Sequence, residues 1–217
     1  MKKIHYYHVF AAGPWQLILN QHMMALCNYG LAEDLDEIRI GIVGPPNARK
    51  SVKEMIATSL IAEKTKIVIE RGVAWEQATL TELWKAAQGE DAVYFYAHTK
   101  GAYDRSIQKQ LWCRSMLFFN IVAYGACLEK LQEADAVGCH WITKEQYPHM
   151  KCETNQEGIP YFAGNFWWSK SEHIRELPEP SRNHRYEAEF WIGSRPGMKV
   201  KDLNPGWPDV NKFMITF

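Results

Sequence analysis

The residues most suited to chemistry follow an apolar run near the middle of the chain. Asp91–Ala97 is mostly aliphatic and aromatic, which predicts a buried strand, and it ends abruptly in His98, Thr99, Lys100 and Gly101. In open α/β sheets, ligands bind just beyond the carboxyl ends of the strands. A lysine and an imidazole at that edge favour an anionic ligand, with phosphate of a nucleotide-activated substrate as the first candidate. The alternative is a set of solvated loop residues.

Two further stretches carry basic residues that could meet phosphate. Arg114 lies one helical stretch after Lys100, and a guanidinium there could bind phosphate through two hydrogen bonds. Residues 44–51 nearly spell a P-loop between a strand and a helix. However, Arg49 stands where the motif needs its second glycine, and two prolines remove backbone donors. We therefore expect a turn leading into a helix.

An aromatic block near residue 165 could contact a polyhydroxylated ligand. Gly164 and Asn165 interrupt a run of aromatic residues, which indicates a bulge or a close approach of a ligand to the backbone. The Asn165 amide can both donate to and accept from hydroxyl groups. On a regular strand Trp167 and Trp168 point to opposite faces, so one indole belongs to the core and the other could face a substrate. A purely structural role is the alternative.

A pair of carboxylates near the C-terminus could supply a general base. Glu187 and Glu189 are two residues apart on an expected helix, so they do not share a face. One of them could point into a cleft beside an aromatic side chain, where burial would raise its pKa and suit it to proton transfer. A structural salt bridge with Arg185 is the alternative.

Metal sites and disulfides are not expected. The five cysteines are scattered and form no CxxC pair, which indicates reduced thiols in a cytoplasmic protein. Cys139, His140, His149 and Cys152 match no common zinc spacing. The N-terminus does not resemble a signal peptide, and no apolar run is long enough for a membrane span.

Strands alternate with helices through the first half of the chain, which predicts a mostly parallel sheet with right-handed crossovers. From Trp141 onward short aromatic segments and turns replace this rhythm, so we expect one domain over residues 1–217. Formal net charge is zero, which argues against a tight, nonspecific nucleic-acid binder. The expected strands are Ile4–Phe10, Glu37–Val43, Lys66–Glu70, Asp91–Ala97, Ala134–Cys139, Tyr161–Trp168 and Phe213–Phe217. The expected helices are Trp15–Tyr29, Ser51–Ala62, Trp75–Ala87, Ile107–Leu131, Lys170–Leu177 and Arg185–Ile192.

Three blocks together resemble glycosyltransferases of the GT-A-like type, and most of all small bacterial and phage proteins related to the rhamnan-synthesis protein F group. The blocks are His98-Thr99-Lys100, Trp112-Cys113-Arg114 and Gly164-Asn165-Phe166-Trp167-Trp168, and the segments 5–9 and 41–44 also fit. The resemblance implies a GT-A-like (Rossmann-like) α/β fold with helices on both faces of the sheet. It further implies a nucleotide-sugar donor over residues 1–140 and an acceptor over the irregular, aromatic-rich residues 141–217.

The resemblance also distributes roles among residues. Donor-binding residues would be Ala11, Gly13, Gly44, His98, Thr99, Lys100 and Arg114. Acceptor-binding residues would be Gly164, Asn165, Trp167 and Trp168. Glu187 or Glu189 would take the proton of the acceptor hydroxyl as the sugar leaves the diphosphate.

The chain departs from the GT-A pattern at the metal site. Such enzymes usually carry Asp-x-Asp after the fourth strand to hold Mn²⁺ or Mg²⁺, and here His98-Thr99-Lys100 takes that place. Asp34-Leu35-Asp36 matches the Asp-x-Asp pattern but lies before a strand, at the opposite sheet edge. We therefore expect no required cofactor, with Lys100 and Arg114 supplying the positive charge instead.

The acceptor has two candidate classes, a glycan or a modified DNA base of the phage type. A basic C-terminal region could touch DNA phosphates; it comprises Arg182, His184, Arg185, Arg195, Lys199 and Lys201. The rival hypothesis is a noncatalytic carbohydrate- or nucleotide-binding module of the same fold, because fold alone does not fix function.

Overall fold

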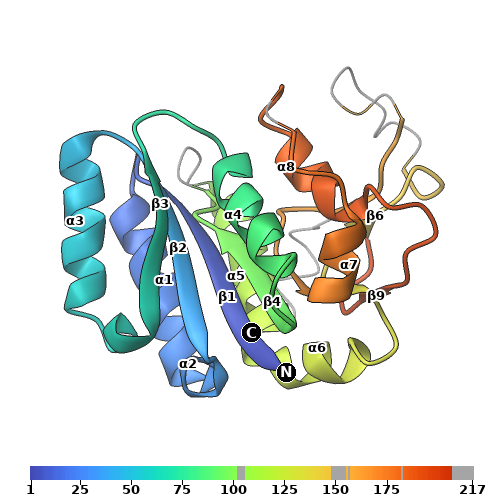
Figure 1. Cartoon of the computed structure of the whole chain (residues 1–217), viewed down its shortest axis with the longest axis horizontal. Helices are drawn as coiled ribbons and strands as arrows, with labels where there is room; N and C mark the ends of the chain where they lie inside the picture. Colours follow the sequence, from blue (N-terminus) through green and yellow to red (C-terminus); the bar gives the residue numbers. More distant parts are fainter. Residues whose placement is uncertain (102–105, 148–154, 156, 182, 207–217) are drawn as a thin grey trace.

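The computed structural model describes residues 1–101, 106–147, 155, 157–181 and 183–206. Its centre is a seven-stranded sheet with the order β3-β2-β1-β4-β8-β5-β9 (Figure 1). The strands are β1 (Lys2–Phe10), β2 (Glu37–Val43), β3 (Thr65–Arg71), β4 (Ala92–His98), β5 (Ala136–Gly138), β8 (Trp167–Lys170) and β9 (Val200–Asp202). A separate hairpin pairs β6 (Trp141–Ile142) with β7 (Tyr161–Phe162).

The sheet is mostly parallel, as the sequence predicts. Strands β3, β2, β1 and β4 are parallel neighbours, whereas β8 runs antiparallel to both β4 and β5. The carboxyl ends of β1, β2, β3 and β4 therefore meet at one edge, where His8 of β1 lies beside both Gly41 of β2 and His98 of β4. This is the edge at which the sequence predicts an anion site.

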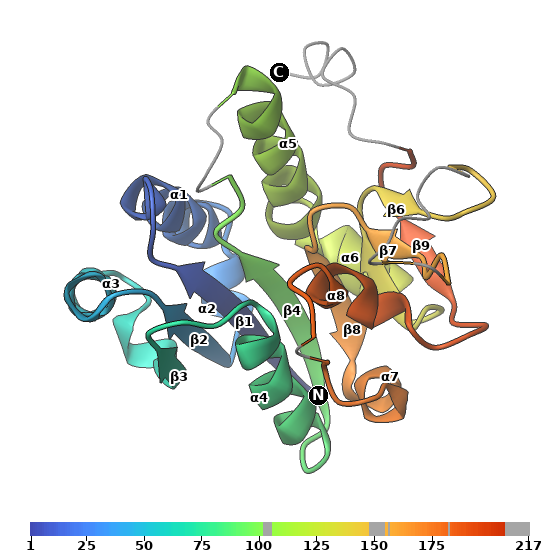
Figure 2. The ribbon, with the colours of Figure 1, turned by 90° about the horizontal axis from the view of Figure 1, so that it is seen from above.

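Helices cover both faces of the sheet, as Figure 2 shows. The helices are α1 (Trp15–Asn28), α2 (Leu31–Asp34), α3 (Pro46–Ala57), α4 (Gln77–Ala87), α5 (Ile107–Leu117), α6 (Tyr124–Lys130), α7 (Ser171–Glu176) and α8 (Glu187–Phe190). Apolar side chains of α1, α3, α5 and α6 pack on one face and those of α4, α7 and α8 on the other. Successive strand residues point to opposite faces of the sheet, so both faces receive core side chains. Phe95 and Trp168 pack on the face that α1 covers, and Tyr96 and Trp167 on the face that α4 covers.

The expected continuous helix over Ile107–Leu131 is wrong. A π-helical turn at Phe118–Val122 follows α5, and the chain then bends by 65° into α6. The buried Asn120 explains the break: its side chain donates to the Met116 carbonyl over 3.0 Å, and its own carbonyl accepts from the Trp168 indole over 3.0 Å. Tertiary hydrogen bonding thus overrides the apolar pattern.

The expected strand Tyr161–Trp168 is also wrong, because it is two short strands in different sheets. Gly164 and Asn165 have φ values of +93° and +57°, and the Asn165 amide closes a turn onto the Phe162 carbonyl over 2.9 Å. A Cβ on Gly164 would lie 2.3 Å from the Met116 sulfur. The group that approaches this backbone closely is therefore a core side chain and not a ligand.

The other corrections are smaller. Helix α3 begins at Pro46, so most of the near-P-loop is helical, and Arg49 lies 3.6 Å from Glu70. Proline at the first helical position suits this start. The expected strand Phe213–Phe217 lies outside the described residues. Within the part of the chain that is described, no single helix has the length and apolarity of a membrane span; only α5 through α6, taken together across their bend, reach them.

Candidate functional site

A groove of about 500 Å³ lies at the carboxyl edge of the sheet. We call it the rim groove; it lies between the ends of β1, β2 and β4, the segment 72–76 and helix α8, and its lining includes His98, Thr99, Lys100 and Glu189. This volume is in the range of small-molecule sites. The structure thus brings the strand-end residues and one of the two predicted carboxylates to a common cavity.

Lys100 places its ammonium group among aromatic and charged neighbours. Its Nζ lies 3.6 Å from Glu189 Oε1 and 4.6 Å from the centre of the Trp112 ring. Lys109 adds a second ammonium 4.4 Å from the same ring. An aromatic face attracts cations, so Trp112 holds both ammonium groups together. With two cations against one carboxylate, this end of the rim groove is suited to an anion.

His98 is buried at the end of β4 and is held on both sides. Its Nε2 donates to the Gly164 carbonyl over 3.0 Å, and its Nδ1 lies 3.3 Å from Glu76 Oε1. Burial, together with the positive charge of Lys100, lowers the pKa of His98 to about 3. The ring is therefore neutral at pH 7, with its proton on Nε2, so the bare Nδ1 lies beside Glu76 Oε1 without donating to it.

Glu76 is a site residue that the sequence analysis missed. It precedes α4 and lies beside His98, and its carboxylate accepts from the Tyr96 hydroxyl over 3.2 Å and from the Asn165 amide over 2.9 Å. The Asn165 oxygen in turn accepts from the Trp167 indole over 2.8 Å. The available signal was position, because Glu76 follows β3 on the same sheet edge as His98.

Thr99 and the two loops after β1 and β2 shape the floor of the rim groove. The Thr99 hydroxyl accepts from the Phe10 amide over 2.9 Å, which ties β4 to the loop that contains Ala11. The Ala11 amide donates to the Val43 carbonyl over 2.7 Å, and a Cβ on Gly44 would lie 2.9 Å from that of Ala11. The two loops thus pack tightly together. Gly13 is exposed at the start of α1 and is not among the residues that line the groove.

Exposed aromatic surface lies at the other end of the rim groove. Trp75 is 46% exposed and Tyr186 is 41% exposed, and both line the groove. The Arg185 guanidinium lies 4.5 Å above the Tyr186 ring. Large exposed aromatic side chains in a concave site are suited to stacking on a planar ligand. The sequence analysis did not identify either ring as a ligand contact.

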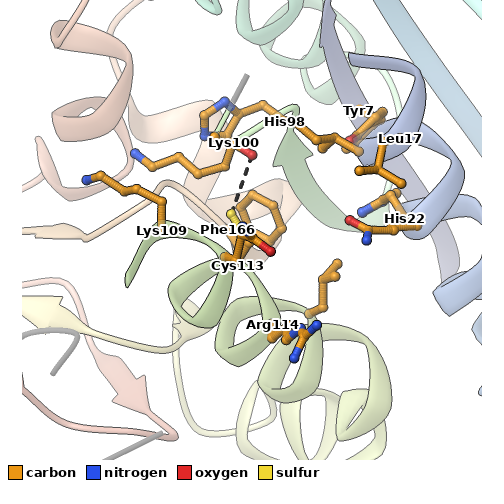
Figure 3. Close-up of a pocket in the computed structure, with 14 residues that line it drawn as sticks. Tyr7, Leu17, His22, His98, Lys100, Lys109, Cys113, Arg114 and Phe166 are labelled. Atoms are coloured by element: carbon orange, nitrogen blue, oxygen red, sulfur yellow. Dashed lines mark hydrogen bonds between the residues drawn. The ribbon is translucent and has the colours of Figure 1, made fainter. Parts of the chain in front are cut away.

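Arg114 does not belong to the rim groove. It is exposed on α5 and lines an adjoining cavity between α1 and α5 (Figure 3). This cavity and the rim groove share His98, Lys100, Gly101 and Lys109 as lining residues. Figure 3 shows the Lys100 and Lys109 side chains extending away from Arg114. Arg114 therefore does not meet Lys100 in the rim groove, although both residues line the adjoining cavity between α1 and α5.

The two predicted carboxylates have different surroundings. Glu189 lines the rim groove beside Lys100. Glu187 lines a different hollow, and its Oε2 accepts from the backbone amides of Asn183 and His184 over 3.2 Å each. Glu187 therefore ties the first residue of α8 to the turn that precedes the helix.

The aromatic block is core rather than surface. Trp167 and Trp168 point to opposite faces as predicted, but both are 0% exposed. Trp168 stacks on Phe95 with 4.9 Å between ring centroids, and Trp167 stacks on Tyr96 at 5.2 Å. Gly164 and Asn165 are buried as well. These four residues offer no surface to an acceptor, which corrects the expectation that one indole faces a substrate.

The donor set at the rim does not fit a divalent cation. Lys100 places an ammonium group at the strand end, and both Glu76 and Glu189 already have partners. Within the described ranges, no group of three or more His, Cys, Asp or Glu side chains could hold a metal ion. Asp34 and Asp36 both contact Lys3 at the amino end of β1, away from the groove. His149 and Cys152 lie outside the described residues.

Comparison with known proteins supports the fold. No family model matches the chain, and no curated protein sequence matches it significantly. HddC from Yersinia pseudotuberculosis superposes with a TM-score of 0.53 at 9% identity, over 94% of this chain and 91% of HddC. A manganese complex of Rv0371c from Mycobacterium tuberculosis H37Rv gives 0.47 at 11% identity over 100% of both chains. The 4-diphosphocytidyl-2C-methyl-D-erythritol synthase of Anaerococcus prevotii gives 0.46 at 11% identity, over 98% and 96%. At these identities, the likeness to HddC establishes that the chain has a mixed α/β fold around a mostly parallel sheet, and it establishes the fold alone.

Proposed function

We propose that the chain is a glycosyltransferase that takes its sugar from a nucleotide-sugar donor bound in the rim groove. The observation that carries the proposal is the pairing of two ammonium groups with one carboxylate at the carboxyl edge of a parallel sheet. That edge is where α/β proteins bind nucleotides. The fold shared with HddC is compatible with a nucleotide-using transferase.

The donor would lie along the groove with its base away from Lys100. Trp75 and Tyr186 are exposed and suited to stack on the base, and Gly44 lines the groove as well. The diphosphate would lie against Lys100 and Lys109. Because these ammonium groups supply positive charge, no divalent ion is needed to offset the negative charge of the diphosphate.

Glu189 is the proposed general base. In the transfer, the acceptor oxygen forms a bond to the anomeric carbon while the bond from that carbon to the diphosphate oxygen breaks. The acceptor proton moves to the Glu189 carboxylate, and the electron pair of the broken bond leaves with the nucleoside diphosphate. Lys100, 3.6 Å from Glu189, would stabilise the developing charge on the leaving group.

A glycan hydroxyl is the preferred acceptor over a modified DNA base. Two cations of the basic C-terminal region are neutralised: Arg195 contacts Asp135 and Glu176, and Lys201 contacts Glu133. Paired cations release few counterions from DNA, so they add little to its binding. Arg182 lies outside the described residues.

A donor panel tests the proposal. UDP-, GDP-, CMP- and dTDP-sugars are screened by thermal shift, because a ligand that binds the native state raises its melting temperature. We expect one nucleotide class to bind, Lys100→Ala to weaken its affinity about tenfold or more, and Arg114→Ala to change it less than threefold. Free nucleotide released on adding glycan acceptors measures transfer.

Two results would count against the proposal in different ways. Binding without release of nucleotide, across the panel and with acceptor present, would identify the noncatalytic binding module instead. Absence of binding by every nucleotide-sugar, or equal losses in the Lys100 and Arg114 variants, would remove the rim groove as a donor site.

A further inference from the structure

The rim groove contains two neighbouring hydrogen-bond acceptors to which no described residue donates. One is Oε1 of Glu76, and the other is Nδ1 of His98, 3.3 Å away. The Glu76 carboxylate uses its second oxygen, Oε2, to accept from the Tyr96 hydroxyl and the Asn165 amide. His98 uses Nε2 to donate to the Gly164 carbonyl. Each side chain is thus anchored through one atom, and its other atom is left for a ligand. We call Glu76 Oε1 and His98 Nδ1 the Glu76–His98 pair.

The Glu76–His98 pair is open to the rim groove. Both residues line the groove, and the side chains of Glu76 and His98 are 19% and 10% exposed. Neither atom is among the fully enclosed polar atoms without a partner in the described part of the chain, so a ligand can reach both. Two lone pairs this close repel each other when no hydrogen lies between them. A ligand that donates to both relieves the repulsion, and its bond to the charged carboxylate is of the stronger kind.

The spacing of the pair decides which donor fits. A single hydroxyl has one hydrogen and satisfies only one of the two atoms. Two hydrogens on one nitrogen diverge, so acceptors at ordinary hydrogen-bond lengths along them are about 5 Å apart rather than 3.3 Å. Amines, amides and ammonium groups therefore fit poorly, and Lys100 and Lys109 in the same groove further disfavour a cation. Hydroxyls on adjacent carbons supply two neighbouring oxygens, each of which can turn its hydrogen toward one acceptor.

We propose that the Glu76–His98 pair binds a vicinal diol of the donor, with one hydroxyl donating to Glu76 Oε1 and the other to His98 Nδ1. The inference rests on the proposed function of the rim groove as a nucleotide-sugar site, and it names the group that the groove recognises by hydrogen bonds. A nucleotide-sugar carries such a diol in two places, the ribose and the transferred sugar. A donor that lacks one of these hydroxyls leaves an acceptor unpaired, so the groove discriminates against it.

Deoxy analogues test the inference by isothermal titration calorimetry, with EDTA in every titration to exclude a bridging metal ion. UDP-glucose and GDP-mannose are the parent probes. Each is compared with its 2′-deoxyribose analogue, which lacks the ribose diol, and with its 3-deoxyhexose analogue, which lacks every vicinal diol of the sugar ring. We expect one analogue to bind about tenfold or more weakly than its parent, which identifies the diol, and the other to bind within twofold.

Glu76→Gln removes the preference while keeping the anchoring contacts. The glutamine oxygen can take the Oε2 position, where Tyr96 and Asn165 donate, which places the nitrogen at the Oε1 position. That nitrogen can donate to His98 Nδ1, so the pair no longer needs a ligand. We expect the variant to be as stable as the unmodified protein in urea, and the weak analogue to bind within twofold of its parent. Glu187→Gln, the same substitution in a different hollow, should keep the tenfold preference.

A measurement on the unmodified protein does not depend on how any variant folds. The ¹⁵N resonance of a bare Nδ1 moves when the atom accepts a hydrogen bond, so a parent probe should shift the His98 signal and the weak analogue at saturation should not. The inference is overturned if neither deletion weakens binding, if Glu76→Gln leaves the preference intact, or if the parent leaves the resonance in place. Binding of a parent without a diol preference overturns this inference alone. Failure of both parents to bind overturns it too, and failure of the whole donor panel removes the proposed function with it.

Discussion

The strand-end cluster at His98-Thr99-Lys100 and the aromatic block at residues 164–168 have opposite surroundings. Lys100 reaches into the rim groove and has a carboxylate, an indole and solvent around it. Trp167 and Trp168 are 0% exposed and donate their indole N–H groups to protein oxygens. A strongly hydrated ammonium resists burial, whereas an indole is buried readily once its one donor is satisfied. Charge at a strand end is therefore the better guide to a site than aromatic content.

The buried block nevertheless supports the exposed cluster. Asn165 donates to Glu76, and Glu76 contacts His98, so a chain of three side chains connects the core turn to the rim. The opposite ring nitrogen of His98, Nε2, donates to the Gly164 carbonyl. The block fixes the orientation of a rim residue without facing a ligand, which is how residues behind a site commonly act.

The largest expected effect separates the two carboxylates of α8. Glu189→Gln should lower the turnover number by about 10²- to 10³-fold, because an amide cannot take the acceptor proton. Nucleotide-sugar affinity should change less than threefold, as measured by calorimetry alongside steady-state release of free nucleotide.

Glu187→Gln is the matched control. Glu187 accepts two backbone N–H groups, and a glutamine oxygen can still do so, which predicts turnover within threefold of the unmodified protein. Turnover that survives Glu189→Gln, or that is lost only in Glu187→Gln, would show that the rim carboxylate is not the base.

The next effect tests whether the aromatic block is structural. Asn165→Asp should lower the free energy of unfolding by about 3 kcal/mol, because it replaces a buried donor with a charged acceptor facing Glu76. Aspartate tolerates a positive φ much as asparagine does, so the backbone at φ +57° is not the cause. Urea denaturation measures the change.

The same substitution at an exposed position controls for the added charge. Asn20→Asp lies on the exposed side of α1 and should change stability by no more than about 0.5 kcal/mol. If both variants are equally stable, the Asn165–Glu76 contact does not support the rim.

The regular half of the fold could be predicted because its patterns are local. Alternating strands and helices specify β1 through β4, and the polar residues that end β4 mark the sheet edge. The rest depends on tertiary contacts that one sequence does not reveal. Asn120 breaks a helix because Trp168 donates to it, and Glu76 joins the site only because the sheet brings it to His98. The sequence also could not show that Arg114 lies outside the rim groove, because helix phase decides which side chains line it.

The smallest expected effect is the pH dependence of stability that arises from histidines buried in β1. These histidines place polar groups in the core of the regular half. Burial lowers the pKa of His5 and His8 to about 4 each. Above about pH 6.5 both rings are neutral in folded and unfolded chains, so stability there is flat with respect to them. Below it the unfolded chain takes up protons that the folded one does not, so stability falls as pH drops toward 4, by about 1.4 kcal/mol per pH unit for each ring. Urea denaturation should show that the free energy of unfolding falls by at least about 2 kcal/mol between pH 7 and 5.5.

His8→Asn keeps a hydrogen-bonding group near Thr79. It should reduce this pH dependence by the contribution of one histidine ring. An unchanged slope would mean that His8 is protonated in the folded chain, and the polar character of the rim would then extend deeper along β1 than its burial indicates.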